Sequence, residues 1–310
     1  MIESIPSTLD GERLDRVVAI LTGASRSEAA AAVTAGQVSV DGEVVAFGKQ
    51  RVHDGDEIEI IGEVGLPAPA PAADATVEIT IVYVYVDDDV IVVDKAADLV
   101  VHPGSGIHDG TLVNGLLARF PEIAAVGQRE RPGIVHRLDR GTTGLLMIAR
   151  TPLAYDSLVA QLAERRAKRR YQAIVCGVPD SASGLIDAPL GRSVRDRTRM
   201  TVTVQGREAR TRYEVVEAFA RPLPSALVTC DLETGRTHQI RVHLAAIGHP
   251  VLGDARYHGH RGELVVARPM LHAASLSFEH PATGEVMTFD APLPADFVAV
   301  LNELSPAERA

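Results

Sequence analysis

A segment rich in proline and alanine interrupts this chain of 310 residues and limits what the chain can fold into. After Gly62 the sequence runs through L-P-A-P-A-P-A-A-D-A. Proline-rich segments of this kind are extended and semi-rigid, so they connect domains and do not enter a packed core. We therefore predict a small domain over residues 1–62, a linker over residues 63–76 and a larger domain over residues 77–310. With 46% hydrophobic residues, the chain can bury a substantial core.

The first 62 residues predict a small α/β unit. Apolar residues between Leu14 and Leu21 recur at helical spacing. A second helix is expected to begin at Ser25, with a glutamate at the capping-box position, and to end at Gly36. An Asp-Gly turn predicts a hairpin over residues 37–44, and alternating apolar residues predict a strand near residues 55–60.

Strand-like patterns dominate the larger domain. β-Branched and aromatic residues predict a strand over residues 77–86, and apolar runs predict strands over 90–93 and 145–149. Three aspartates, residues 87–89, lie between the first two strands. We expect a turn there and not a calcium site, because no further oxygen ligands follow at the required spacing. Many strands and few long helices predict an α+β domain.

Basic residues are concentrated in the middle of the chain. Residues 129–212 contain 17 of the 31 Lys and Arg residues but only 8 of the 41 Asp and Glu residues, whereas the whole chain has a formal charge of −10. Helical spacing predicts a helix over residues 154–170 with a basic end, followed by a strand from Tyr171. An arginine-rich hairpin is expected at 191–212, with strands over 200–204 and 209–215. Such arginine density favours contacts with phosphates, although a solvated surface is the alternative.

Several classes of protein and site are not expected. The first residues lack the pattern of a secretory signal, and no apolar run could span a bilayer, so a cytoplasmic protein is expected. Cys176 and Cys230 lie alone in separate apolar segments, which indicates a reducing compartment. The five-residue separation of His238 and His243 does not match a helical zinc pair, so no metal is expected.

One carboxylate stands among cations next to a predicted turn. Asp139 follows His136 and Arg137, precedes Arg140, and lies directly before G-T-T-G and the apolar run 145–149. Nearby positive charge favours the ionised and therefore nucleophilic form of an aspartate. The spacing alone favours a structural Arg–Asp pair that closes a turn.

Two long motifs carry a resemblance to a known family. The string H-R-L-D followed by T-T-G-L-L, and the string T-G-R-T-H-Q-I-R-V-H-L with G-H-P-V-L-G-D, resemble the signatures of the RluA-type pseudouridine synthases. Within that family the resemblance is greatest to the D-type (RluD-like) branch, which acts on the RNA of the large ribosomal subunit. The resemblance implies a catalytic domain built on a mixed, largely antiparallel sheet. The chain has Ala96 and Asp98 where this family usually has proline and glycine.

The same resemblance implies roles for particular residues. Asp139 is implied as the catalytic nucleophile, with Arg241 paired to it. Tyr171 is implied to stack on the target uracil and Leu271 to pack against it. The remaining residues implied to bind substrate in this domain are Arg137, His136, Arg236 and His238.

The order R-L-D, S-R-S, G-Q-V-S-V-D-G and G-D-E-I within residues 1–62 resembles the RNA-binding domain named for ribosomal protein S-four. It implies an RNA surface formed by Arg13, Arg16, Arg26, Gly36 and Gln37. Five basic and eleven acidic residues make this unit acidic, which is unfavourable for binding phosphates. A packing or orienting module is therefore the alternative.

The resemblance implies an isomerase that converts specific uridines of large-subunit ribosomal RNA to pseudouridine without a cofactor. We expect a monomer that binds ribosomal RNA or a pre-ribosomal particle and no membrane. Asp139 could attack the ribose carbon, add to the base or deprotonate the sugar. The alternatives are a non-catalytic ribosome-assembly factor that binds ribosomal RNA and a base-excising glycosidase, although the pair of carboxylates that glycoside hydrolysis commonly uses is not evident.

Overall fold

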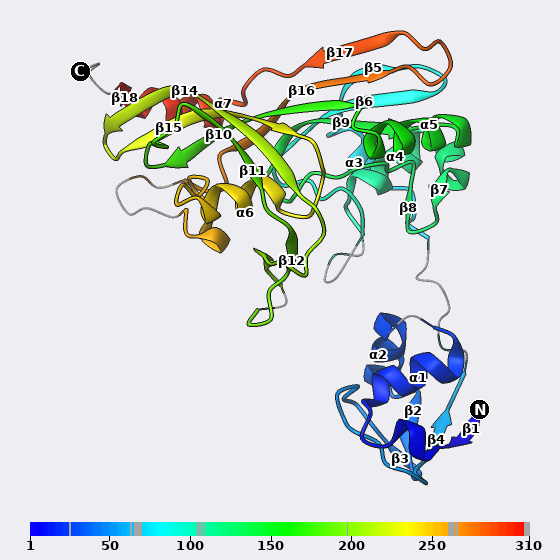
Figure 1. Ribbon diagram of the computed structural model, residues 1–310. Helices are drawn as coiled ribbons and strands as arrows, with labels where there is room; N and C mark the ends of the chain where they lie inside the picture. Colours follow the sequence, from blue (N-terminus) through cyan, green and yellow to red (C-terminus); the bar gives the residue numbers. More distant parts are fainter. Residues whose placement is uncertain are drawn as a thin grey trace. The chain divides into compact units, whose positions relative to one another are not determined.

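The computed structural model (Figure 1) describes residues 1–24, 26–62, 64, 70–103, 107, 109–196, 198–259, 264 and 266–306. Within these ranges the chain forms two compact units, Met1–Ala70 and Pro71–Ala310. Ser25, which was expected to cap a helix, and Arg197 of the arginine-rich segment lie outside the described residues, as does much of the Pro/Ala segment. No helix among the described residues is long and apolar enough to cross a membrane.

The first unit packs two helices against a small antiparallel sheet with the strand order β1-β4-β2-β3. Its elements are β1 (Ile2–Ser4), η1 (Ser7–Leu9), α1 (Leu14–Thr22), α2 (Arg26–Thr34), β2 (Val38–Val40), β3 (Glu43–Val44) and β4 (Glu57–Ile60). Leu14 and Val17 of α1 are fully buried with Ile58 of β4 in one apolar core. The predicted hairpin is confirmed, because β2 pairs with β3 across Asp41 and Gly42, which both have positive φ.

A ten-stranded sheet organises the second unit, and its main strand order is β11-β14-β15-β10-β16-β9-β6-β5. β17 pairs with β16, and β18 pairs with β14. All of these pairs are antiparallel except β9 with β16, so the expectation of a mixed, largely antiparallel sheet is confirmed. β7 with β8 and β12 with β13 form two separate two-stranded sheets. The strands of the whole unit are β5 (Val82–Val86), β6 (Val90–Lys95), β7 (Gly127–Gln128), β8 (Arg131–Pro132), β9 (Thr143–Ala149), β10 (Lys168–Cys176), β11 (Ser183–Asp187), β12 (Leu190–Arg192), β13 (Met200–Val202), β14 (Arg210–Arg221), β15 (Ser225–Leu232), β16 (Leu271–Glu279), β17 (Val286–Asp290) and β18 (Ser305–Pro306).

Helices cover this sheet, and β9 is buried on both faces. The helical elements are α3 (Ala75–Glu78), α4 (Leu112–Arg119), η2 (Pro121–Ala125), α5 (Pro152–Ala163), α6 (Gln239–Ala246), η3 (Ala255–Tyr257) and α7 (Ala295–Glu303). Leu146 and Ile148 of β9 share a core with residues of α4, whereas Met147 shares another with residues of α5. Burial on both faces explains why this strand reads as a continuous apolar run.

The start of the larger unit was wrongly predicted as one long strand. The structure has a helical turn, α3, over Ala75–Glu78, and the strand begins only at Val82. The carboxylate of Asp74 accepts a hydrogen bond from the backbone N–H of Thr76 at 2.9 Å and so caps the turn. An N-cap aspartate therefore outweighs the strand propensity of the residues that follow it.

The basic run after α5 was wrongly predicted as the end of a helix. α5 ends at Ala163, and Arg165 has a φ of 62°, which stops the helix. Lys168–Arg170 instead begin β10, where Arg170 lies opposite Asp231 of β15 and bonds to its carboxylate at 2.8 Å. This pairing joins segments far apart in sequence, so local periodicity could not indicate it.

The arginine-rich segment forms a hairpin other than the one predicted. β13 pairs with β12, and the strand that follows, β14, pairs with β11 and β15 instead of with β13. Arg207 joins this arrangement through an isolated bridge to Leu190. The prediction paired the strand at 200–204 with the strand that follows it, at 209–215. In the structure β13 instead pairs with β12, which precedes it in the sequence.

Candidate active site

Asp139 lies in the loop before β9, where a tight turn fixes its position. The backbone N–H of Thr142 donates to the carbonyl of Asp139 at 3.1 Å, and Gly141 within the turn has a φ of 86°. Gly144 follows with a φ of 106°, and a Cβ there would lie 2.2 Å from the carbonyl oxygen of Ala273. β9 can approach β16 in this parallel pairing only because residue 144 has no side chain. The turn thus places Asp139 beside the start of β16.

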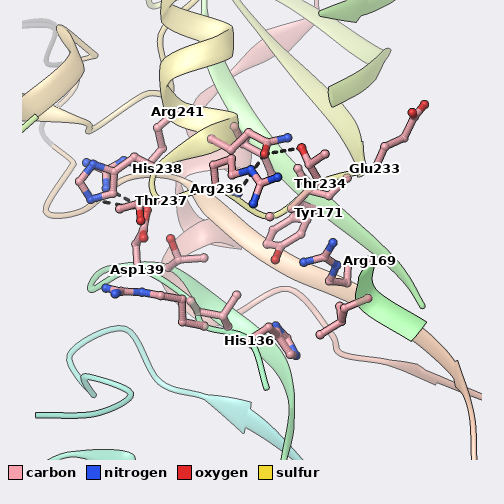
Figure 2. Close-up of a pocket in the computed structure, with 18 of the residues that line it drawn as sticks. His136, Asp139, Arg169, Tyr171, Glu233, Thr234, Arg236, Thr237, His238 and Arg241 are labelled. Atoms are coloured by element: carbon pink, nitrogen blue, oxygen red, sulfur yellow. Dashed lines mark hydrogen bonds and ion pairs between the residues drawn. The ribbon is translucent and has the colours of Figure 1, made fainter. Parts of the chain in front are cut away.

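A cavity of about 630 Å³ opens at Asp139 (Figure 2). It is lined by residues from the loop before β9, from β10, from the loop and helix around α6 and from the start of β16. All of the residues predicted for catalysis or substrate binding in the larger unit line this cavity: His136, Arg137, Asp139, Tyr171, Arg236, His238, Arg241 and Leu271. Among the described residues, no group of three or more His, Cys, Asp or Glu side chains could hold a metal ion.

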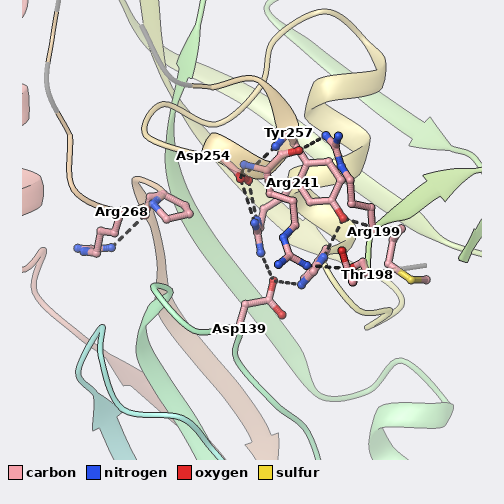
Figure 3. Close-up of polar contacts among 11 residues, drawn as sticks. Asp139, Thr198, Arg199, Arg241, Asp254, Tyr257 and Arg268 are labelled. Atoms are coloured by element: carbon pink, nitrogen blue, oxygen red, sulfur yellow. Dashed lines mark hydrogen bonds and ion pairs between the residues drawn. The ribbon is translucent and has the colours of Figure 1, made fainter. Parts of the chain in front are cut away.

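The guanidinium of Arg241 contacts two carboxylates (Figure 3). Its Nη1 atom donates to Oδ2 of Asp139 at 3.1 Å. Nε and Nη2 donate to the two oxygens of Asp254 at 2.6 and 2.9 Å. Arg241 and Asp254 are buried, whereas the Asp139 side chain is 14% exposed. Although burial alone would lower the pKa of Arg241, the bond to Asp254 and the charge of Asp139 raise it above its ordinary value, so the guanidinium remains a permanent cation at the carboxylate.

His238 approaches the same carboxylate from the start of α6. It has a φ of 57°, and this left-handed backbone turns its ring toward the cavity. Nδ1 lies 2.8 Å from the hydroxyl of Tyr257, and Nε2 lies 4.0 Å from Oδ2 of Asp139. Burial lowers the pKa of His238, so the ring is neutral near pH 7 and contributes a polar edge without a second charge.

Tyr171 and Leu271 supply apolar surface next to Asp139. Tyr171 lies on β10 opposite Ala273 of β16, and Leu271 lies on β16 opposite Ala173. The two side chains are 4% exposed, and both line the cavity. Burial raises the pKa of the Tyr171 phenol; the positive charge of Arg169 opposes this shift, and the negative charge of Asp139 adds to it. A planar ligand in the cavity would therefore contact an uncharged ring.

His136 lines the cavity, and a hydrogen bond from the backbone defines the tautomer of its ring. The backbone N–H of Met147 donates to its Nε2 at 3.1 Å, so the ring proton is on Nδ1, which has no partner in the described part of the chain. Burial lowers the pKa of His136 to about 3, and the positive charge of Arg169 contributes, so the ring is neutral. Its Nδ1–H is an unused donor at the cavity wall.

Comparison with known proteins identifies this arrangement. Residues 89–246 match the family described as RNA pseudouridylate synthase, and residues 12–58 match the S4 domain. The chain is 42% identical to the uncharacterized RNA pseudouridine synthase YlyB of Bacillus subtilis, with 94% of each chain covered. The chain belongs to the RNA pseudouridylate synthase family.

Further relatives in this family support the same assignment. The chain is 41% identical to the ribosomal large subunit pseudouridine synthase D of Pasteurella multocida, over 95% of this chain and 91% of that one. Among solved structures it resembles human RNA pseudouridylate synthase domain containing 1, with a TM-score of 0.56 and 30% identity over 73% of this chain and 89% of that chain. The resemblance stated from the sequence motifs is confirmed.

Two buried residues that interact with the site, Asp254 through Arg241 and Lys95 through the charge of Asp139, received no role from the sequence. Asp254 ends the second motif, yet only the structure shows that it holds Arg241. Lys95 lies at the end of β6, 1% exposed, and its Nζ donates to the carbonyls of Ala96 and Leu99 at 2.7 and 2.8 Å. Burial lowers the pKa of Lys95 to about 8, and the charge of Asp139 opposes this shift. A lysine that ends an apolar strand is a weak signal of a buried cation.

The arginines expected to bind RNA in the first unit are engaged with carboxylates. Arg13 and Arg26 both bond to Asp15, and Arg16 bonds to Glu12. The side chains of Arg16 and Arg26 are still 51 and 53% exposed. Gly36, with a φ of 74°, and Gln37 connect α2 to β2. Carboxylates therefore already pair with the three arginines of the expected RNA surface, which stays a prediction.

Proposed function

We propose that this protein isomerises uridines of large-subunit ribosomal RNA to pseudouridine, with Asp139 as the nucleophile. The observation that carries the proposal is the pairing of Asp139 with Arg241 at 3.1 Å in a cavity that Tyr171 and Leu271 also line. The relatives named ribosomal large subunit pseudouridine synthase D support the RNA class. We place the enzyme in the cytoplasm as a monomer that acts on ribosomal RNA or a pre-ribosomal particle.

The proposed reaction is an internal rearrangement. The bond between the ribose carbon and N1 of uracil breaks, the base turns, and a carbon–carbon bond forms to C5. The proton lost from C5 is balanced by a proton gained at N1, so nothing is oxidised and no group is imported. No cofactor is therefore proposed.

Each side chain around Asp139 has a proposed part in this reaction. Arg241 holds the carboxylate through a hydrogen bond and aims it into the cavity. Tyr171 and Leu271 hold the uracil, which has to leave its stack to reach the carboxylate. Walls on several sides keep the freed base close to the sugar, and confinement of this kind replaces a diffusional encounter. Arg137, Arg236, His136 and His238 provide polar contacts around the nucleotide.

The first unit is proposed to contribute RNA contacts through Arg13, Arg16 and Arg26 and through the loop with Gly36 and Gln37. The relevant support is the match of residues 12–58 to the S4 domain. Because carboxylates already pair with these arginines, we propose that the unit recognises RNA shape and adds little net phosphate attraction.

The decisive experiment is a comparison of the wild-type protein with Asp139→Asn. In cells that lack the protein, pseudouridines are mapped in large-subunit ribosomal RNA before and after each form is supplied. Wild type should restore the modification, and Asp139→Asn should bind the RNA but restore none, because an amide is not nucleophilic. Pseudouridine made by Asp139→Asn would refute the assignment.

The same cells separate the alternatives. Restored growth without pseudouridine in the Asp139→Asn strain would indicate a role in ribosome assembly that depends on binding. Release of free uracil from RNA by the purified wild type would indicate base excision instead of isomerisation.

A further inference from the structure

Arg169 is a buried cation that no carboxylate neutralises within the described part of the chain. It lies on β10 two positions before Tyr171, so the two side chains share a face of the sheet (Figure 2). The residue is 8% exposed, and its Nε atom has no hydrogen-bond partner among the residues that the structure describes. Its exposed neighbour Arg170, by contrast, bonds to Asp231. Burial lowers the pKa of Arg169, as expected for a guanidinium without a counter-ion.

The other arginines that line the cavity do not share this condition. Arg131 is only half-buried, and its Nε donates to the side-chain oxygen of Gln128 at 2.7 Å. Arg165 pairs with Glu208, and Arg241 pairs with its two aspartates. Arg137 and Arg236 are exposed, so water can solvate them. A buried charge without a partner is strongly unfavourable in a folded protein. Arg169 therefore gains most from an anion that comes from outside the chain.

Arg169 also occupies the boundary of two cavities. The cavity at Asp139 shares part of its lining with a second one of about 450 Å³, and the shared residues are Arg165, Arg169, Leu232 and Glu233. The second cavity is lined further by Lys168, Arg170 and Arg212 and by the carboxylates of Asp231 and Asp290. Asp231 already pairs with Arg170, so an RNA strand that leaves the first cavity in this direction meets Arg169 as the buried cation without a carboxylate partner among the described residues.

We propose that Arg169 binds a backbone phosphate adjacent to the uridine held at Asp139. The inference rests on the proposed function, because it takes RNA as the ligand. A guanidinium binds phosphate oxygens through parallel charge-assisted hydrogen bonds. A uracil carbonyl could accept a hydrogen bond from Arg169 but would leave its charge unbalanced, so the phosphate is the better partner.

Gly235 provides the space for this guanidinium. A Cβ at residue 235 would lie 2.6 Å from Nη1 of Arg169, and its backbone φ is not in the left-handed region. The glycine of the T-G-R string thus leaves the space that the guanidinium of Arg169 occupies, and no backbone strain is involved. Gly235→Ala should displace the guanidinium of Arg169 without removing it.

The test measures RNA binding and needs no turnover. The probe is a short single-stranded RNA with one uridine, prepared with normal linkages or with one neutral methylphosphonate on either side of that uridine. Fluorescence anisotropy gives the Kd for wild type, Arg169→Met, Gly235→Ala and Arg166→Met. Arg166 is the matched control, because it is paired with Glu164 and Glu279 and lines neither cavity.

One methylphosphonate should weaken wild-type binding about tenfold, as expected for the loss of one charge-assisted contact. Arg169→Met should bind the normal RNA about tenfold more weakly and should lose nothing further with that methylphosphonate. Gly235→Ala should show an intermediate loss, and Arg166→Met should behave as wild type. If each methylphosphonate still weakens binding to Arg169→Met as much as to wild type, Arg169 does not bind the phosphate.

Thermal melting separates binding from a structural role. Because Arg169→Met removes a buried charge without a partner, its Tm should equal or exceed that of the wild type. A lower Tm together with an equal loss of affinity for all three RNAs would assign Arg169 to the fold and overturn the proposal. A wild type that shows the phosphate coupling but forms no pseudouridine would refute the proposed function alone.

Discussion

The guanidinium of Arg241 depends on Asp254 for its orientation. Asp254 takes the Nε and Nη2 atoms in a two-point contact, which leaves Nη1 for Asp139 (Figure 3). Asp254 is itself held, because its Oδ1 accepts from the backbone N–H groups of Arg256 and Tyr257 at 3.1 and 3.2 Å. The orientation of Asp139, the proposed nucleophile, is therefore set by a chain of contacts that ends in the backbone of η3.

Asp254→Asn should lower turnover more than binding. The amide puts an NH2 donor where one of the two carboxylate oxygens accepted from Arg241, so the two-point contact is lost. A guanidinium shifted by about 1 Å can cost on the order of 100-fold in rate. Single-turnover kinetics at saturating RNA should show this loss, with a Kd close to that of wild type. Glu122→Gln is the control, because it removes a surface pair with Arg150, which is worth at most about 1 kcal/mol. A rate within threefold of wild type would show that Asp254 does not position Arg241.

Lys95 gives the fold a defined pH dependence. Its pKa is about 8 in the folded protein and 10.5 in the unfolded chain, so between these values the unfolded state binds more protons. The free energy of unfolding should therefore rise with pH across this window, relative to that of Lys95→Met, in which the group is absent. Urea unfolding at several pH values between 8 and 10.5 measures the difference. A constant difference across the window would mean that burial does not shift this lysine.

Helices and strands that local sequence signals define could be predicted, whereas those defined by pairing with distant parts of the chain could not. β9 and the hairpin of β2 and β3 were predicted, because an apolar run and an Asp-Gly turn are local sequence signals. The start of β10 was not, because Lys168–Arg170 pair with strands about 60 and 100 positions later. In the site, motifs identified Asp139 and Arg241, whereas the burial of Lys95 and Arg169 depends on packing that no short string records.

The approach of β9 to β16 depends on one glycine. Gly144→Ala should destabilise the larger unit by about 3 kcal/mol or more, because it adds a clash with the backbone of Ala273 to the strain of a positive φ. Gly284→Ala is the matched control. Gly284 has a φ of 73° with open space around its Cβ position, so the substitution adds strain of only about 1–2 kcal/mol. Equal losses in urea unfolding would show that the clash with Ala273 is relieved.

For the whole molecule, charge is divided between an acidic first unit and a basic central segment. Residues 1–62 contain five basic and eleven acidic residues, and ion pairs occupy Arg13, Arg16 and Arg26. The basic central segment covers residues 129–212, and its arginine-rich part at residues 191–212 has Arg195 and Arg207 exposed. Binding that releases counterions from phosphates should therefore come mainly from this segment, whereas the first unit should contribute through shape.

The salt dependence of RNA binding tests this division. Removing residues 1–62 should weaken binding to large-subunit ribosomal RNA but leave the slope of log Kd against log salt almost unchanged, because paired arginines displace few counterions. Arg195→Gln with Arg207→Gln should instead reduce the slope, by about 1 for each lost phosphate contact. The apolar cores of the two units are separate, so the truncated chain retains its own. A truncation that reduces the slope as much as the double substitution would assign phosphate contacts to the first unit, and the ion pairs to Asp15 and Glu12 would then have to open when RNA binds.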